Sequence, residues 1–132
     1  MIVREALVPD PRVVAADAGV QEAAQLLTRP NVRSVLVVDG ERLVGCVTAE
    51  TLVAAVASGV DVRTLTAREV CDTEVPTIGP DGLIDDALHL MAESDLERLP
   101  VVENGRLLGI LPREPLVRRL AEDEAPREPE DS

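Results

Sequence analysis

Residues 37–48 read VVDGERLVGCVT, and sixty-four positions later residues 101–112 read VVENGRLLGILP. Each copy has a Val-rich run, then a Gly-containing turn, then a second apolar run, which is the pattern of a β-hairpin. Repetition at a fixed spacing is typical of a fold built from similar units. The sequence therefore predicts two related halves.

The repeat continues on both sides of the hairpin. Without a gap, the offset holds from Val3 to Ala57, and Gly45 and Gly109 are among the identical pairs. Apolar spacing predicts the order strand, helix, strand, strand, helix in each half, with Asp17 and Asp81 as helix N-caps. The expected elements are strands at 13–15 and 76–78, helices starting near 19 and 82, hairpins at 34–48 and 98–111, and closing helices that carry Leu52 and Leu116.

The two halves are expected to depend on each other. A unit of about 60 residues is only marginally stable alone, so we expect one mixed α/β (α+β) globule of tandem βαββα repeats with pseudo-two-fold symmetry and paired clefts. We assign residues 2–58 to the first repeat, 59–66 to a connecting segment and 67–121 to the second repeat. Residues 122–132 are acidic and lack apolar periodicity, which predicts a disordered tail.

The amino-acid composition and net charge exclude some classes of binding partner. The chain of 132 residues is 45% hydrophobic without any Phe, Tyr or Trp, so its core is expected to be aliphatic. A net charge of −12 argues against binding to nucleic acid or to an anionic membrane, because both require clustered basic residues. Cys46 and Cys71 are too few for a disulfide framework, and we find no signal or spanning segment, so we expect a soluble cytoplasmic protein.

The residues for catalysis are not present in a recognisable arrangement. His89 is the single histidine, and the sequence has neither a cluster of metal-ligand residues nor a phosphate-binding glycine motif. Because enzymes need several groups placed together, we expect a protein that is not an enzyme and that requires no metal or cofactor.

Each half resembles a cystathionine-β-synthase (CBS) domain, and the pair resembles a Bateman module. The resemblance spans residues 2–121 and is carried by four runs: Leu99-Pro100-Val101-Val102, Val35-Leu36-Val37-Val38-Asp39, Gly45-Cys46-Val47-Thr48 and Gly109-Ile110-Leu111. It implies the tandem fold described above and a disc-shaped homodimer. It also implies clefts that hold AMP, ADP, ATP or S-adenosylmethionine between paired repeats.

The resemblance also implies positions for ligand contacts. In the family, a Thr or Ser after the last strand, and an Asp three residues later, contact phosphate and ribose. Here Thr48 and Thr51 occupy these positions in the first repeat. Thr51 has fewer acceptor sites than an aspartate and no charge, so the contact to ribose is expected to be weakened. Pro112 and Pro115 occupy the same positions in the second repeat.

A basic residue before Leu-Pro-Val contacts phosphate in the family. Arg98 keeps this position, and Arg33 is its nearest equivalent in the first repeat. The cleft with Thr48, Thr51 and Arg98 is therefore the candidate ligand site. The cleft with Pro112, Pro115 and Arg33 is expected to lack a nucleotide.

Each of these residues also has a structural interpretation. Thr48 is a good N-cap with Thr51 in the first turn of a helix, and the two arginines can pair with acids such as Glu97. Two functions therefore stay open. One is a non-enzymatic regulatory module that senses an adenosine-type ligand in one cleft and signals to an unknown partner protein. The other is a ligand-free dimeric interaction or scaffold protein. A homodimer is expected through six apolar residues: Leu52, Val53, Val56, Leu116, Val117 and Leu120.

Overall fold

The computed structural model describes residues 1–10, 12–94 and 96–114. The strands are β1 (Val13–Ala15), β2 (Ser34–Asp39), β3 (Arg42–Thr48), β4 (Arg98–Glu103) and β5 (Arg106–Pro112). The helices are α1 (Val20–Leu27), α2 (Ala49–Ala57), α3 (Ala67–Val70) and α4 (Ile84–Ser94), with short 3-10 turns η1 (Val3–Glu5) and η2 (Val62–Thr64). The predicted final helix and the acidic tail lie outside the described residues.

The strands form one sheet with the order β1-β2-β3-β5-β4. The β2–β3 and β4–β5 hairpins are antiparallel, and each has a register shift at the same place, between Val37 and Val38 and between Val101 and Val102. The two hairpins meet where β3 pairs with β5 at Arg42 and Arg106, next to the turns. This arrangement confirms the predicted mixed α/β fold of two repeats.

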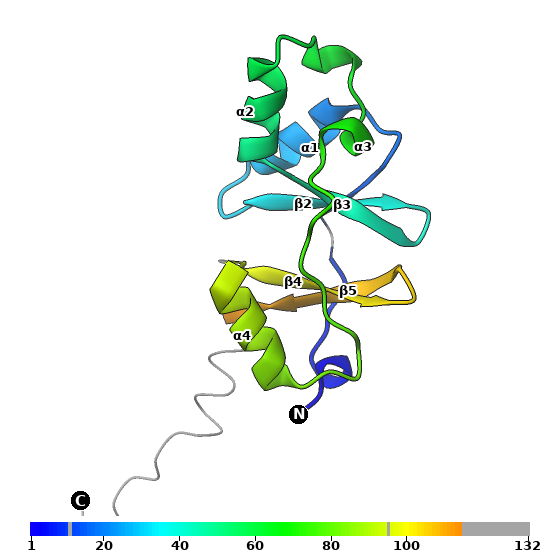
Figure 1. The fold of residues 1–132 in the computed structure, drawn as a ribbon, viewed down its shortest axis with the longest axis vertical. Helices are drawn as coiled ribbons and strands as arrows, with labels where there is room; N and C mark the ends of the chain where they lie inside the picture. The colour runs from blue at the N-terminus through cyan, green and yellow to red at the C-terminus, as the bar shows by residue number, and fades with distance from the viewer. Residues whose placement is uncertain (11, 95, 115–132) are drawn as a thin grey trace, which may run out of the picture.

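Helices cover the outer side of each hairpin. In Figure 1 the hairpins lie one above the other, with α1, α2 and α3 beyond β2–β3 and with α4 beyond β4–β5. Two aliphatic cores result, one in each repeat. The first includes Val20, Ala23, Val35, Val37 and Val47. The second includes Ile84, Ala87, Met91, Leu99, Val101 and Leu111.

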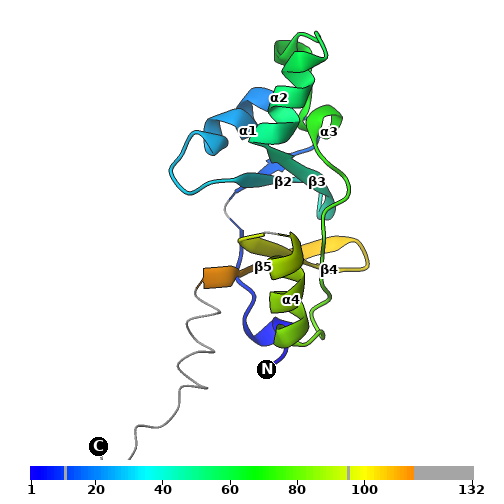
Figure 2. The same cartoon turned by 60° about the vertical axis from the view of Figure 1, so that its left-hand side comes forward.

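The segments that begin each repeat are exchanged between the two cores. Val3, at the start of the first repeat, is fully buried in the second core, whereas Ala67 and Val70 are buried in the first. The Val3 N–H donates to Gly82 O at 2.9 Å, and the equivalent Ala67 N–H donates to Ala18 O at 2.8 Å. Figure 2 shows η1, in dark blue, beside α4, and Figure 1 shows α3 beside α1. The halves are therefore interlocked, because each completes the core of the other.

The predicted N-caps are wrong for the same reason. Helix α1 starts after Gly19 rather than Asp17, and α4 begins at Ile84, beyond Asp81. The backbone before α1 pairs with the end of the connecting segment, through Gly19 and Thr66, and the backbone before α4 pairs with the first repeat, through Leu83 and Ile2. This pairing sets where each helix begins. The Asp81 carboxylate instead contacts Arg4 at 3.4 Å.

The strand predicted at 76–78 is reduced to one bridge between Ile78 and Val101. In the first repeat, the Leu36 N–H donates to Arg12 O at 3.1 Å and so extends the pairing of β1. Pro100 takes the place of Leu36 in the second repeat and has no N–H to donate. The pairing therefore cannot extend toward Pro76.

Candidate functional site

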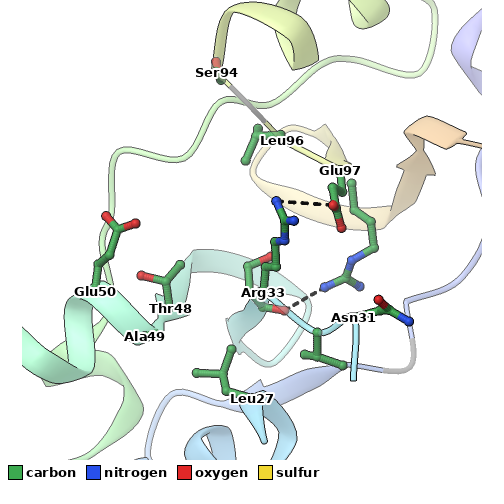
Figure 3. Close-up of a pocket in the computed structure, with 12 residues that line it drawn as sticks. Leu27, Asn31, Arg33, Thr48, Ala49, Glu50, Ser94, Leu96 and Glu97 are labelled. Carbon is green, nitrogen blue, oxygen red and sulfur yellow. Dashed lines mark hydrogen bonds and ion pairs between the residues drawn. The ribbon is translucent and has the colours of Figure 1, made fainter. Parts of the chain in front are cut away.

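A cavity of about 540 Å³ opens between the two repeats (Figure 3). Its walls come from the end of α1, the start of β2, the β3–α2 junction and the α4–β4 segment. The lining residues are Leu27, Asn31, Val32, Arg33, Ser34, Thr48, Ala49, Glu50, Ser94, Leu96, Glu97 and Arg98. Both repeats therefore contribute to one site.

A second cavity of about 500 Å³ adjoins the first and shares Thr48, Glu50, Ser94 and Leu96 with it. It adds Cys46, Thr51, Ala54, Asp72, Glu74, Val75 and Pro76 to the lining. We treat the two cavities as lobes of one cleft, with Thr48 at their junction. Each lobe is within the size range of small-molecule sites.

Thr48 and Thr51 form a reciprocal capping box at the start of α2. The Thr51 N–H donates to Thr48 Oγ1 at 3.2 Å, and the Thr48 N–H donates to Thr51 Oγ1 at 2.9 Å. The Thr51 hydroxyl also donates to Thr48 O at 2.9 Å, so it already acts as both acceptor and donor. The Thr48 hydroxyl only accepts in this motif, which leaves its proton for a group in the cleft.

Arg98 is held in the wall of the cleft, with 12% of its side chain exposed. Its Nη1 lies 2.6 Å from Asp10 Oδ1, and its Nη2 donates to Ser34 O at 2.7 Å. Burial lowers the pKa of Arg98, and the Asp10 carboxylate opposes this shift. Asp10 has a side chain that is only 1% exposed. Sequence reasoning missed Asp10, because nothing local links it to a residue 88 positions away.

Arg33 lines the same lobe as Thr48 and Arg98, although the sequence placed it in the other cleft. Its Nη1 lies 3.4 Å from Glu97 Oε1, and both side chains are more than half exposed. Arg33 and Glu97 are equivalent positions of the two repeats, as are Ser34 and Arg98. The pseudo-two-fold axis therefore passes between these contacts and brings both arginines to one site. Pro112 ends β5 opposite Arg98, and Pro115 lies outside the described residues.

Comparison with known proteins identifies the repeats. The family model described as "CBS domain" matches residues 3–58 and 67–122. The chain belongs to the CBS domain family. This CBS pair is 39% identical over 97 residues to "Uncharacterized protein YlbB" of Bacillus subtilis, covering 70% of this chain and 64% of that protein. It is 32% identical over 110 residues to "CBS domain-containing protein YhcV" of the same species, covering 83% and 78%.

Part of a larger protein also matches the CBS pair. Inosine-5'-monophosphate dehydrogenase of Korarchaeum cryptofilum is 28% identical over 106 residues, which are 80% of this chain but only 21% of that enzyme. The chain likewise spans less than two thirds of YlbB. The match to the dehydrogenase is therefore partial.

Two solved structures share the fold of the CBS pair and contain ligands. CBSX2 in complex with AMP is 26% identical, with a TM-score of 0.74 over 92% of this chain and 97% of that chain. The CBS domain pair of MJ0100, in complex with 5-methylthioadenosine and S-adenosyl-L-methionine, is 25% identical, with a TM-score of 0.70 over 94% and 98%.

The cleft of this CBS pair contains more acidic than basic side chains. Arg33 and Arg98 are the basic residues in the linings of the two lobes, against four carboxylates, which are Glu50, Asp72, Glu74 and Glu97. Burial, with smaller contributions from Asp72 and Cys71, raises the pKa of Cys46 from 9.0 to about 11. Cys46 therefore presents a neutral thiol to the cleft at neutral pH.

Two further findings concern only the part of the chain that the structure describes. Within residues 1–10, 12–94 and 96–114, no group of three or more His, Cys, Asp or Glu side chains is placed to hold a metal ion. None of the helices described there has both the length and the apolar character to cross a membrane. The cytoplasmic location stays a prediction.

Proposed function

We propose that this CBS pair is a non-enzymatic regulatory module that binds an adenosine-type ligand in the cleft between its repeats and signals to a partner protein. The observation that carries the proposal is the cleft itself, where the Thr48 hydroxyl, Arg33 and Arg98 meet in one lobe of about 540 Å³. AMP, ADP, ATP and S-adenosylmethionine are the candidate ligands. CBS proteins of the same fold, solved with AMP and with S-adenosyl-L-methionine, support this class.

Because the cleft lies between the repeats, ligand binding there can change how the two repeats are arranged. A ligand there touches Thr48 and Glu50 of the first repeat and Ser94 and Leu96 of the second at the same time. If its affinity differs between two arrangements of the repeats, binding shifts their equilibrium. A partner protein that recognises one arrangement would then sense the ligand.

The test is thermal unfolding with AMP, ADP, ATP and S-adenosylmethionine, each at millimolar concentration. A ligand at 100 times its Kd adds about 2.7 kcal/mol to the free energy of unfolding, which raises Tm by several degrees. The variant Ser94→Trp places a large ring in the cleft and should abolish the shift. The matched control is Glu93→Trp, one position earlier on α4 and not part of the cleft lining, which should retain the shift.

A second function is favoured by the capping box. The Thr51 hydroxyl is already used within α2, and Arg98 is already paired, so the predicted ligand contacts have structural roles. The alternative is therefore a ligand-free dimeric scaffold. In that case none of the four compounds would raise Tm, and Ser94→Trp would behave like Glu93→Trp.

A homodimer forms part of both proposals, and α2 supports it. Val53 is 66% exposed and Val56 is 61% exposed, and they leave an apolar strip on this helix. Leu52 instead packs against the first core. We expect sedimentation to give twice the 14.1 kDa of one chain, and Val53→Asp to give the monomer. Leu83→Asp, at an apolar position before α4 that is 56% exposed, should leave the dimer intact.

A further inference from the structure

The most buried ion pair among the described residues lies in the wall of the cleft, between Asp10 and Arg98. The Asp10 side chain is 1% exposed, and its Oδ1 accepts both from Arg98 Nη1 at 2.6 Å and from the Arg12 N–H at 2.8 Å. Its other oxygen, Oδ2, is buried without a hydrogen-bond partner in the described structure. Such a carboxylate depends strongly on the cation in contact with it, which here is Arg98.

The fold itself does not require this pair. The equivalent positions in the other half are Glu74 for Asp10 and Ser34 for Arg98. Glu74 is exposed and lines the second lobe, and Ser34 cannot form an ion pair. The two hairpins therefore keep the same register with and without the pair, although the segment at 76–78 pairs less extensively than β1. The ion pair is therefore present in only one of the two equivalent positions, the one in the wall of this cleft.

The pair decides which charges a ligand meets. Arg98 presents a cation whose charge is already balanced from inside the wall by Asp10. Arg33 is paired as well, but with an exposed carboxylate at 3.4 Å, from which solvent or a ligand can separate it. Across both lobes the remaining lining charges are acidic. A phosphate can recruit Arg33 readily, but it can fully recruit Arg98 only by leaving Asp10 buried and unpaired.

We propose that Asp10 is a specificity-determining residue of this cleft: as the internal counter-ion of Arg98, it limits the ligand to few negative charges. The inference rests on the proposed function and deepens it. The favoured ligands are adenosine compounds that are neutral, cationic or singly phosphorylated. Nucleoside di- and triphosphates bind more weakly, because each added phosphate meets Glu50 and Glu97 without a second available cation.

The experiment compares a series of compounds of increasing negative charge on wild type and three variants. Adenosine, AMP, ADP, ATP and inorganic pyrophosphate are titrated by calorimetry into wild type, Asp10→Asn and the control Asp85→Asn, which removes an exposed charge on α4. Wild type should bind ADP and ATP more weakly than AMP. Asp10→Asn should gain about tenfold in affinity for ATP and pyrophosphate, relative to any change for adenosine. Adding Arg98→Gln should remove the gain, and Asp85→Asn should behave as wild type.

The pyrophosphate measurement separates the two proposals, because it needs no adenosine site. If no adenosine compound binds either protein, but Asp10→Asn gains pyrophosphate affinity through Arg98, the proposed function fails and the role of Asp10 stands. Equal effects of Asp10→Asn on all five compounds, or no effect, would overturn it. Should Asp10→Asn not fold, NMR of wild type decides: pyrophosphate should shift the side-chain N–H signal of Arg33 but not that of Arg98. A shift of both would contradict the proposal.

Discussion

The hydroxyl groups of Thr48 and Thr51 lie in one motif but differ in what they leave available. Thr51 both accepts from and donates to the backbone of Thr48, whereas the hydroxyl proton of Thr48 is not used in the capping box. The Thr51 hydroxyl stabilises only the helix, whereas the Thr48 hydroxyl can stabilise the helix and also donate to a ligand. Effects on stability and on ligand binding can therefore be measured separately at this site.

We expect Thr51→Ala to lower the free energy of unfolding by about 1 kcal/mol, the usual cost of losing a helix cap, and to leave ligand affinity unchanged. Thr48→Ala should lower both. The matched control is Thr66→Ala, because Thr66 forms a similar capping box with Glu69 outside the cleft. Denaturant unfolding and calorimetry measure the two effects. Equal loss of affinity in both cleft variants would argue that Thr51 contacts the ligand.

Cys46 provides a pH-dependent test. Its pKa in the fold is about 11 against an ordinary value of 9.0, so the unfolded chain loses this proton first as the pH rises. The stability that burial of the neutral thiol provides is present below pH 9 and is lost as the pH rises toward 11. The chain has no Lys or Tyr, so few other groups titrate in this range. Cys46→Ala should flatten the fall in Tm between pH 9 and 11, and a fall as steep as that of wild type would contradict this.

At the scale of elements, two equivalent glycines let the exchanged segments approach the hairpins. A Cβ on Gly45 would overlap Asp72 O, where the Asp72 N–H donates to Cys46 O at 2.8 Å. A Cβ on Gly109 would lie 2.5 Å from Val8 O. Both obstacles are backbone atoms, which cannot move aside as a flexible side chain can.

We therefore expect Gly45→Ala and Gly109→Ala each to cost about 1–3 kcal/mol of stability, the range for overpacking. Gly79→Ala is the control, because a Cβ added there would have no atom within 4 Å and its φ is not in the left-handed region. Thermal unfolding of the three variants provides the measurement. A Gly45→Ala protein as stable as Gly79→Ala would show that the segment around Asp72 is not held against β3.

The same elements show what a sequence can predict. The bounds of β2, β3 and β4 follow from Val-rich runs beside Gly turns, which are local signals, and they agree with the structure. Local signals misplace the start of α1, because Gly19 pairs with Thr66, which lies far away in the sequence just before the second repeat. They miss the pairing of Arg98 with Asp10 for the same reason. The local motif locates Thr48, but which charges surround it depends on contacts between the repeats.

At the scale of the whole molecule, the residues that form one sequence repeat are not the same residues that pack into one core. The first core needs Ala67 and Val70, which belong to the second sequence repeat, and it does not include Val3. Residues 9–72 contain every described element of the first core. Residues 1–64 are equally long but lack α3.

We expect the fragment 9–72 to be more ordered than the fragment 1–64, because only the former can bury the α1 face against Ala67 and Val70. Circular dichroism and NMR dispersion of the two peptides measure this. The companion variant Val70→Asp should remove the advantage of fragment 9–72. Equal order in both fragments would show that the exchanged helix adds little to the first core.

The exchange also affects the order in which the protein can be completed during synthesis. Residues 1–8 are made before the second repeat, yet Val3 is buried in the same core as Leu99 and Leu111, which are made much later. The carbonyl of Met1 likewise gains its hydrogen bond only after Ile84 is made, because the Ile84 N–H donates to Met1 O at 3.2 Å. This apolar segment therefore cannot be buried in its core until the second repeat has been translated. A fusion partner placed before Met1 would accordingly disturb the repeat farthest from it in sequence, and spare the one that it precedes.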